Sequence, residues 1–254
     1  MAVAAPVLVL DVLDSTNAEA RRRAEAGETD PLWIAARQQT AGRGRRGREW
    51  ASDSGNLFTT LLMHTDRPAA EAAQVTFVAA LAVADLLDRY APPSLVTIKW
   101  PNDVMLAAQK ASGVLVESGP AERGGLWVAV GIGVNLAHAP SNVERPATSL
   151  AEHLSGDTIA PPDPAVAAEV LAKAFAIWMD RWETLGFTPV LDAWRRRTRL
   201  EGPCTARLGH ETVSGVAEGV EADGALRLRL PDGALRIIAA GDVFFGPSSF
   251  AGAA

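Results

Sequence analysis

A run of glycines and arginines at residues 40–48 is the part of the sequence best suited to holding an anion. Its central order is Gly42-Arg43-Gly44-Arg45-Arg46-Gly47-Arg48. Glycine lets backbone amides come close to a ligand and permits positive φ angles. Arginine keeps its charge and can form paired hydrogen bonds with phosphate or carboxylate oxygens. The segment therefore predicts a loop that closes over an anionic ligand.

The same run permits other interpretations. Gly42, Gly44 and Gly47 match the G-x-G-x-x-G pattern of dinucleotide-binding folds, but that pattern opens a helix in a crossover of a dozen or more residues. Only eight residues separate Gly47 from Asn56, and they include the turn-forming residues 52–55. No Gly-Lys-Ser/Thr follows, so the run is not a phosphate-binding P-loop. An arginine-rich arm for nucleic acid and a solvated surface loop stay open as alternatives.

A second polar cluster lies at a predicted junction between a strand and a turn, where the sequence reads Lys99-Trp100-Pro101-Asn102-Asp103. Lys99 is suited to neutralising phosphate. Asp103 is suited to holding Mg²⁺, which binds through one or two carboxylates plus substrate phosphates. Pro-Asn-Asp is also an ordinary turn sequence, so a purely structural interpretation stands beside the functional one.

Two further segments carry single residues of interest. Lys110 precedes an apolar strand, and Asn135 ends another strand that contains Gly131 and Gly133. An exposed turn lysine and a strand whose glycines permit close packing would explain both without a ligand. Only three of the 24 basic residues are lysines, and Lys99 and Lys110 are two of them. A coding bias toward arginine explains the low count and makes these two positions more notable.

The composition limits the class of protein. With 254 residues, 48% of them hydrophobic, the chain can bury a sizeable core, and its net charge of −6 argues against a protein that coats nucleic acid. Cys204 cannot form an internal disulfide, and the four histidines lack zinc-ligand spacing. We see neither a secretory signal nor an apolar stretch near the roughly 20 residues of a membrane span. We expect a cytoplasmic protein with no zinc, no membrane association and no nucleic acid partner.

The elements that would position these residues follow from hydrophobic periodicity. Strands are predicted at residues 7–13, 32–38, 57–63, 96–100, 113–117 and 126–136. Helices are predicted at residues 17–26, 70–90, 163–185 and 189–199, with a short helix after Ser149. Ser149 and Glu152 have the spacing of a capping box, and so do Thr16 and Glu19 at the start of the first helix.

The pattern changes after Gly202-Pro203. Short β-like runs are separated by Gly209-His210, Asp223-Gly224 and Asp232-Gly233, of which the last two are strong hairpin signals. Hairpins over about 45 residues make a small barrel or sandwich with little core of its own. We therefore expect a larger domain at residues 1–200 and a small β domain at residues 201–254 that leans on it.

Taken in order, the motifs of the chain resemble those of the biotin protein ligase family. The shared segments are Ser15-Thr16-Asn17, Gln39 to Arg48, Lys99 to Asp103, Lys110 with Gly113-Val114-Leu115-Val116-Glu117, and Gly131-Ile132-Gly133-Val134-Asn135-Leu136. The resemblance implies an α+β fold, a mixed β-sheet with flanking helices as in biotin/lipoate ligases, followed by a small SH3-like β-barrel. About six residues precede the first strand, so the winged helix of members that also repress transcription is not expected. Ala111 departs from the larger apolar residue usual in the family, which is a minor packing change.

The resemblance also implies roles for individual residues. Lys110, at the reacting carboxylate and the α-phosphate, and Arg45 are the expected catalytic residues. Biotin is expected to contact Ser15, Thr16, Asn17, Gln39, Arg43, Gly44, Arg45 and Lys110. The nucleotide is expected to contact Arg43, Arg45, Trp50, Lys99, Asn102, Lys110 and Asn135, with Mg²⁺ at Asp103. A core position for Trp50 is an equal alternative.

The implied activity is a two-step ligation. ATP, with Mg²⁺, would activate biotin to biotinyl-5'-AMP, and a lysine of a biotin carboxyl carrier protein would then accept the biotin. A homodimer is among the assemblies that the sequence permits. A lipoate or octanoate protein ligase is the alternative enzyme, although the arginine-glycine run favours biotin. A non-catalytic nucleotide- or nucleic-acid-binding module is the alternative outside the enzymes.

Overall fold

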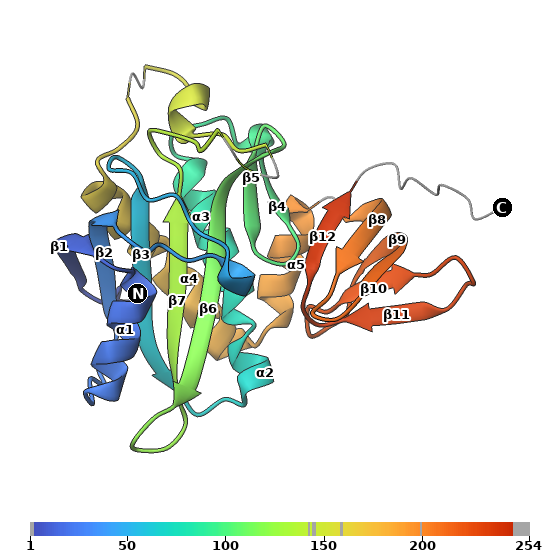
Figure 1. The fold of residues 1–254 in the computed structure, drawn as a ribbon, viewed down its shortest axis with the longest axis horizontal. Helices are drawn as coiled ribbons and strands as arrows, with labels where there is room; N and C mark the ends of the chain where they lie inside the picture. Colours follow the sequence, from blue (N-terminus) through green and yellow to red (C-terminus); the bar gives the residue numbers. More distant parts are fainter. Residues whose placement is uncertain (1–2, 142, 144–145, 158–159, 199, 246–254) are drawn as a thin grey trace.

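The larger part of the molecule is a mixed sheet of seven strands, in the order β1-β2-β3-β7-β6-β5-β4 (Figure 1). The computed structural model describes residues 3–245 apart from residues 142, 144–145, 158–159 and 199. The strands are β1 (Val7–Leu13), β2 (Leu32–Gln39), β3 (Leu57–Thr65), β4 (Val96–Lys99), β5 (Asp103–Leu106), β6 (Gln109–Pro120) and β7 (Leu126–Val134). β1 and β2 run parallel, and the other neighbouring pairs are antiparallel. The expected mixed sheet is confirmed.

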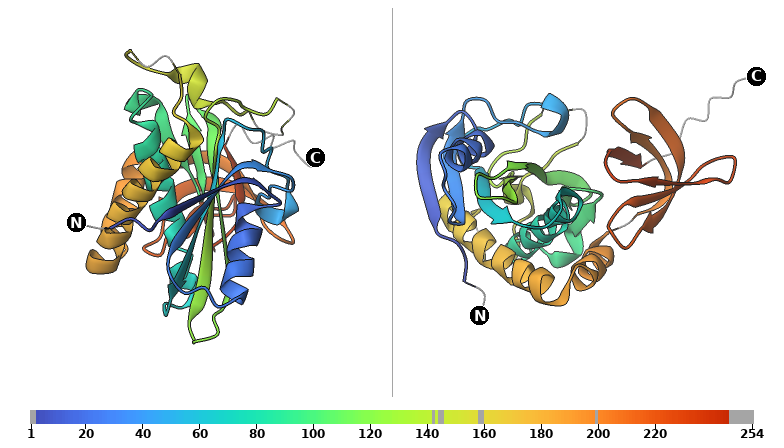
Figure 2. Two further views of the ribbon diagram at one scale, coloured as in Figure 1. Left: turned by 90° about the vertical axis from the view of Figure 1, so that its left-hand side faces the viewer. Right: turned by 90° about the horizontal axis from the view of Figure 1, so that it is seen from below.

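Helices cover the two faces of this sheet unequally. One face carries α1 (Thr16–Glu25), and the other carries α3 (Val75–Leu87), α4 (Pro164–Leu185) and α5 (Thr188–Arg197) (Figure 2). Short helical turns lie at α2 (Ala69–Ala72), η1 (Arg45–Gly47), η2 (Pro93–Leu95) and η3 (Leu150–His153). The main hydrophobic core lies between the sheet and helices α3 and α4, and only a small apolar cluster lies under α1. Much of the sheet face that carries α1 is therefore not covered by a helix.

The most apolar helix of the chain is part of this core. The sequence predicts one helix at residues 70–90, whereas the structure breaks it after Ala72 and resumes it at Val75. By length and composition alone, residues 69–87 are long and apolar enough to cross a membrane. This finding corrects our expectation that the chain contains no apolar stretch of such a length. Most of this segment is buried inside the protein, with α3 packed between the sheet and α4, as a core helix of a globular protein is.

The hairpin of β5 and β6 is absent from the sequence prediction, which assigned a turn to residues 101–103 and a strand only from residue 113. In the structure Leu106 pairs with Gln109, so Ala107 and Ala108 form a two-residue turn with φ angles of 50° and 64°. Two-residue hairpin turns with positive φ at both positions normally carry Asn-Gly or Asp-Gly. The turn chemistry that would have revealed the hairpin is therefore missing from the sequence.

This turn gives the first testable prediction. Replacing Ala107 with asparagine and Ala108 with glycine should raise the free energy of unfolding by about 1–2 kcal/mol, because alanine is strained in the left-handed region. Urea unfolding of the double variant measures the change. Ala107→Val is the control of opposite sign, since a β-branched residue at positive φ should destabilise the protein. Equal stability of all three proteins would contradict the prediction.

The C-terminal part is an antiparallel sheet of five strands in the order β11-β10-β9-β8-β12. The strands are β8 (Glu201–Arg207), β9 (Thr212–Val220), β10 (Leu226–Arg229), β11 (Leu235–Ile238) and β12 (Asp242–Phe245). The hairpin turns at Gly224 and Gly233 are confirmed, with φ angles of 93° and 86°. Trp100 fastens this sheet to the larger one, because its Nε1 donates to the Gly224 carbonyl at 2.9 Å. Residues 246–254 lie outside the described residues.

Candidate active site

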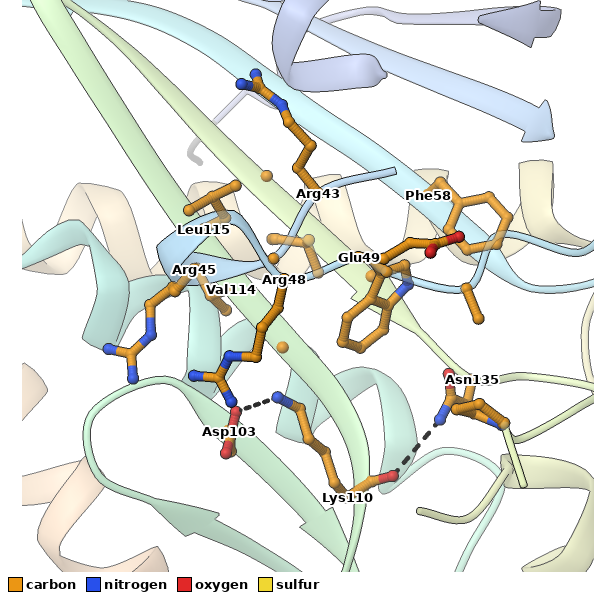
Figure 3. A pocket seen from close by; sticks show the side chains of 18 of the residues that line it. Arg43, Arg45, Arg48, Glu49, Phe58, Asp103, Lys110, Val114, Leu115 and Asn135 are labelled. Atoms are coloured by element: carbon orange, nitrogen blue, oxygen red, sulfur yellow. Dashed lines mark hydrogen bonds and ion pairs between the residues drawn. The ribbon is translucent and has the colours of Figure 1, made fainter. Parts of the chain in front are cut away.

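A cavity of about 540 Å³ opens on the α1 face of the large sheet (Figure 3). It is enclosed by the start of α1, the arginine loop of residues 40–50, strands β3, β6 and β7, the loop after Val134, and Asp242 of β12. The cavity brings together nearly all the residues singled out from the sequence, namely Ser15, Thr16, Asn17, Gln39, Arg43, Gly44, Arg45, Trp50, Asn102, Asp103, Lys110 and Asn135. Lys99 is the one candidate that does not line it.

Two glycines of β7 create the space for this site. Side chains alternate along the strand, so Val130 and Ile132 enter the main core while Gly131 and Gly133 face the cavity. A Cβ on Gly131 would lie 2.0 Å from the Asn17 Oδ1 atom, and one on Gly133 would lie 2.5 Å from the Trp50 ring. The two glycines therefore permit close packing against the strand, as the sequence analysis considered. The side chains that pack against them are those of Asn17 and Trp50, which both line the cavity.

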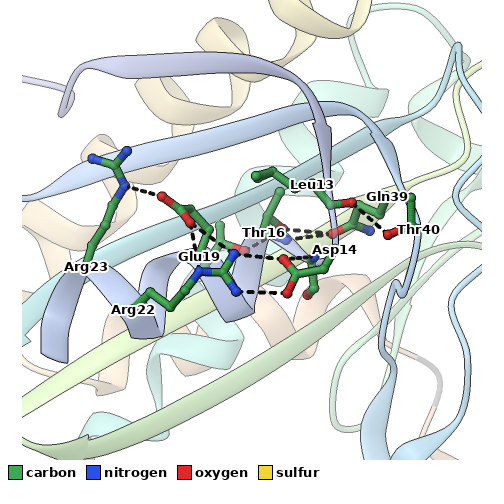
Figure 4. Close-up of polar contacts among 10 residues, drawn as sticks. Leu13, Asp14, Thr16, Glu19, Arg22, Arg23, Gln39 and Thr40 are labelled. Atoms are coloured by element: carbon green, nitrogen blue, oxygen red, sulfur yellow. Dashed lines mark hydrogen bonds and ion pairs between the residues drawn. The ribbon is translucent and has the colours of Figure 1, made fainter. Parts of the chain in front are cut away.

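One end of the cavity is neutral and polar. The backbone N–H of Thr16 donates to the Gln39 Oε1 atom at 2.8 Å, and the Thr16 hydroxyl lies 3.2 Å from the same oxygen (Figure 4). The predicted capping box of Thr16 and Glu19 is wrong, because Ser15 is the N-cap residue and Glu19 pairs with arginines instead. Thr16 is the first residue of α1 rather than its N-cap, and it lines the cavity. The capping box at Ser149 is confirmed.

Asn17 is held in one orientation by groups to which the sequence analysis assigned no role. Its Nδ2 donates to the Leu115 carbonyl at 3.3 Å and to the Glu117 Oε2 atom at 2.7 Å. Its Oδ1 accepts from the Thr60 hydroxyl at 2.7 Å. Thr60 is fully buried and was hidden in an apolar strand. Because both amide hydrogens are used, the remaining capacity of Asn17 is that of an acceptor.

The start of α1 is also anchored by a carboxylate. Asp14 accepts from the Ser15 backbone at 2.7 Å and from two guanidinium nitrogens of Arg22 at 2.8 Å. The hydrogen bonds from Arg22 lower the pKa of Asp14 to about 2. Because the folded-state pKa lies below the ordinary value of 3.8, this stabilisation is present above pH 4 and is lost as the pH falls toward 2.

A pH prediction follows for Asp14→Asn. Since the Arg22–Asp14 pair is about half exposed, the wild type should be more stable than this variant by less than about 1 kcal/mol at neutral pH. The difference should shrink steadily below pH 4, because protonation removes the same charge from the wild type. Urea titrations of both proteins between pH 6 and pH 3 measure it. A difference that stays constant over this range would contradict the assignment.

Lys110 lies at the other, charged part of the cavity. Its Nζ atom is 2.5 Å from the Asp103 Oδ1 atom and 5.5 Å from the centre of the Trp50 ring. The β5–β6 hairpin carries both charged residues, and the Asn135 Nδ2 atom lies 3.5 Å from the Lys110 carbonyl oxygen (Figure 3). The Asp103 carboxylate and the face of the Trp50 ring together fix the position of the Lys110 ammonium.

Two polar atoms in the cavity wall have no hydrogen-bond partner among the described residues. They are Trp50 Nε1, a donor, and Asn102 Oδ1, an acceptor. A buried polar group without a partner costs about 1–3 kcal/mol, which a ligand would recover. No group of three or more His, Cys, Asp or Glu side chains gathers in the described part of the chain. The Asn102 and Asp103 oxygens nevertheless fit Mg²⁺, which takes one or two carboxylates and completes its shell with phosphates and water.

The arginine loop divides its charges between two directions. Arg43 points away from Arg45 and Arg48 and lies 3.3 Å from Glu117 (Figure 3). Arg45, Arg46 and Arg48 instead converge on Asp242, whose side chain is 7% exposed. Their side chains reach from the loop to the first residue of β12. These ion pairs connect the arginine loop to the C-terminal sheet.

Asp242 is the functional candidate that sequence reasoning missed most clearly. Burial alone would raise the pKa of this carboxyl, but the charges of Arg45 and Arg48 outweigh burial and hold the pKa below its usual value. The sequence offered only an aspartate after Gly241, nearly 200 residues from its arginine partners. Without the fold, nothing connects the two segments.

The comparisons with known proteins agree with this geometry. The chain matches the Biotin/lipoate A/B protein ligase family over residues 9–135 and the Biotin protein ligase C terminal domain over residues 200–246. These matches define a ligase of the biotin and lipoate class. A biotin--[acetyl-CoA-carboxylase] ligase of Paracoccus denitrificans is 45% identical over 236 residues, covering 92% of this chain and 98% of the relative. A bifunctional ligase/repressor of Bacillus subtilis is 31% identical, covering 91% of this chain and 71% of the relative.

Solved structures show the same fold. The biotin protein ligase from Aquifex aeolicus in complex with biotin and ATP has a TM-score of 0.75 and 24% identity, covering 94% of this chain and 97% of its own. The Leishmania major ligase in complex with biotinyl-5-AMP has a TM-score of 0.63 and 23% identity, covering 92% of this chain and 99% of its own. Together with the sequence matches, these findings show that the chain belongs to the biotin protein ligase family and is a ligase enzyme.

Proposed function

We propose that the protein activates biotin with ATP to biotinyl-5'-AMP and transfers the biotin to a lysine of a biotin carboxyl carrier protein. One observation carries the proposal: a single cavity joins a neutral polar end, at Thr16, Asn17 and Gln39, to a charged end at Lys110 and Arg45. Biotin has a neutral ureido ring at one end and a carboxylate at the other. The 45% identity to the Paracoccus ligase over nearly the whole chain supports the same activity.

The neutral end would bind the ureido ring. Asn17 has acceptor capacity for a ureido N–H, and Ser15, Thr16 and Gln39 add hydroxyl and amide groups. Phe58 and Leu115, together with Trp50, provide apolar surface for the fused ring and the acyl chain. In this arrangement Arg43 and Gly44 close the loop over the biotin. A small polar head between apolar walls is the usual form of a specific ligand pocket.

The charged end would hold the reacting groups. The biotin carboxylate and the α-phosphate of ATP repel each other, so the site must neutralise both before a bond forms. The Lys110 ammonium would contact one oxygen of the biotin carboxylate and one of the α-phosphate. Arg45, which pairs with Asp242 in the structure, would exchange this carboxylate for phosphate. Asn102, Asn135 and the Trp50 indole would contact the nucleotide, with Lys99 near the phosphates.

The chemistry then proceeds in two steps. A carboxylate oxygen of biotin attacks the α-phosphorus, and pyrophosphate leaves with the electron pair of the broken P–O bond. Asp103 and Asn102 would hold Mg²⁺, which supplies further charge neutralisation on the phosphates. The amine of the acceptor lysine next attacks the acyl carbon and expels AMP. Closure of the arginine loop would protect the mixed anhydride from water.

We also propose the boundaries of the two domains and the finer fold of the second. Residues 1–200 form the catalytic domain, and residues 201–254 form the C-terminal domain, an SH3-like barrel built on the sheet β11-β10-β9-β8-β12. The cytoplasm, where ATP and carboxylases meet, is the proposed location. We also propose a homodimer, which a light-scattering measurement of the molar mass in solution would test.

Pyrophosphate exchange into ATP tests the substrate of the proposed function. The purified protein should catalyse exchange that depends on biotin, while lipoate and octanoate at the same concentration should support less than about one-hundredth of it, because a site built for hydrogen bonds rejects acids that lack them. Exchange driven equally well by lipoate or octanoate would assign the protein to the alternative ligase. DNA retention without any exchange would favour a non-catalytic module.

A further inference from the structure

Glu117 of β6 lies just beyond the neutral end of the cavity and takes no part in the chemistry proposed above. It is two residues from Leu115, which lines the cavity, so the two side chains share the α1 face of the sheet. Its partner across the ladder, Ala129, belongs to the small apolar cluster under α1. The side chain of Glu117 is 36% exposed, so its carboxylate is open to solvent on one side and to the site on the other.

One oxygen of this carboxylate accepts hydrogen bonds from two residues of the site. The Glu117 Oε2 atom lies 2.7 Å from the Asn17 Nδ2 atom and 3.3 Å from the Arg43 Nη2 atom. Asn17 comes from the first turn of α1 and Arg43 from the arginine loop, so a single atom joins two walls of the cavity. The bond to Asn17 is the stronger of the two, because it is short, charge-assisted and made to a buried amide.

The Glu117 carboxylate determines which way the Asn17 amide faces. Carboxylate and carbonyl oxygens only accept hydrogen bonds, so Glu117 and the Leu115 carbonyl both require N–H groups from this amide. The Asn17 Oδ1 atom must then point the opposite way, toward the Thr60 hydroxyl and Gly131 in the cavity wall. An acceptor at this end of the cavity selects a ligand that carries N–H donors.

We propose that Glu117 is a positioning residue that makes the neutral end of the cavity specific for acids with ureido N–H donors, by holding Asn17 as an acceptor and tying Arg43 of the arginine loop to it. This inference rests on the proposed function and deepens it, because it explains a preference for the cyclic urea of biotin over octanoate and lipoate, which lack such donors. Glu117 does not line the cavity, so it acts through Asn17 and Arg43 rather than by touching the ligand.

Glu117→Leu tests this role with two probes, biotin and an analogue in which CH2 groups replace both ureido N–H groups. Once the carboxylate is removed, the Asn17 amide is free to turn. The affinity for biotin should then fall about 30-fold, as expected when one or two ligand hydrogen bonds are lost. The affinity for the analogue should change by less than about threefold, because it never made those bonds. Calorimetric titration measures both.

Glu117→Gln is the conservative variant. Its side-chain carbonyl still accepts from the Asn17 amide, so the ratio of the two affinities should stay within about threefold of the wild-type ratio. In pyrophosphate exchange, Glu117→Leu should raise the KM for biotin and leave kcat nearly unchanged, since the charged end of the cavity keeps its groups. Glu117→Ala should repeat the result of Glu117→Leu, so the test does not depend on the folding of one variant.

Glu25→Leu is the matched control. Glu25 and Glu117 line a common groove beside α1, but the Glu25 carboxylate bonds to Arg21 at 2.7 Å instead of to Asn17. This variant should keep the wild-type ratio of affinities for biotin and the analogue.

Three results would overturn the inference. They are an unchanged ratio in Glu117→Leu and Glu117→Ala, an equal loss of affinity for both ligands in these variants, and a fall of the ratio in Glu117→Gln as large as in Glu117→Leu. Absence of biotin-dependent exchange in the wild type would instead overturn the proposed function, so the two failures are distinguishable.

Discussion

Lys110→Ala is expected to slow biotin-dependent pyrophosphate exchange by about 10²–10³-fold while changing the affinity for biotin by less than about tenfold. In the proposed mechanism, the Lys110 ammonium would stabilise charge that develops on the α-phosphate. Loss of one such donor from a preorganised site typically costs about 3–4 kcal/mol of activation free energy. Biotin keeps its contacts at the neutral end of the cavity. Exchange kinetics and calorimetric titration with biotin measure the two effects.

Two controls make the Lys110 result interpretable. Lys110→Ala leaves the buried Asp103 carboxylate without its partner, so Lys110→Gln, which keeps a hydrogen-bond donor near Asp103, separates loss of fold from loss of chemistry. Lys173→Ala removes an exposed lysine of α4 and should be silent. Exchange at the wild-type rate in folded Lys110→Gln would remove Lys110 from the chemistry.

Gly131→Ala is expected to weaken biotin binding by about 100-fold without unfolding the protein. A methyl group at this position would lie 2.0 Å from the Asn17 Oδ1 atom, and so Asn17 must leave its bonds to Thr60 and Glu117. The loss of two ligand hydrogen bonds at about 1.4 kcal/mol each accounts for the expected magnitude. Calorimetric titration with biotin measures the affinity.

Gly209→Ala is the control for this substitution. No atom lies within 4 Å of a Cβ at Gly209, and its φ angle is not positive, so the change should be neutral. Circular dichroism should show the same fold for both variants. Wild-type affinity for biotin in Gly131→Ala would mean that Asn17 does not contact the ligand.

The order of strands and helices could be predicted where periodicity and end signals coincide. Residues 163–185 carry an aspartate N-cap and a first-turn proline, and α4 spans Pro164–Leu185. The turns at Gly224 and Gly233 were likewise predicted. The β5–β6 hairpin was not, because Ala107 and Ala108 occupy positions that glycine or asparagine usually fills. Tertiary packing overrode local preference there.

The site was predictable only as separate segments. Thr16, Lys110 and the glycines of β7 are far apart in the sequence, and the family resemblance, rather than their spacing, suggested that they meet. The partners that orient them are ordinary residues: Thr60 in an apolar strand, Glu117 within β6, and Asp242 at the start of β12. Such residues acquire their roles from long-range contacts that no local pattern encodes.

The most direct test of the account is detection of the intermediate itself. Purified protein incubated with biotin, ATP and Mg²⁺ should form biotinyl-5'-AMP, identified by mass spectrometry, and the intermediate should disappear when a biotin carboxyl carrier protein is added and its lysine is labelled. Absence of biotinyl-5'-AMP from folded protein under these conditions would contradict the claim that one cavity unites the acid with the nucleotide.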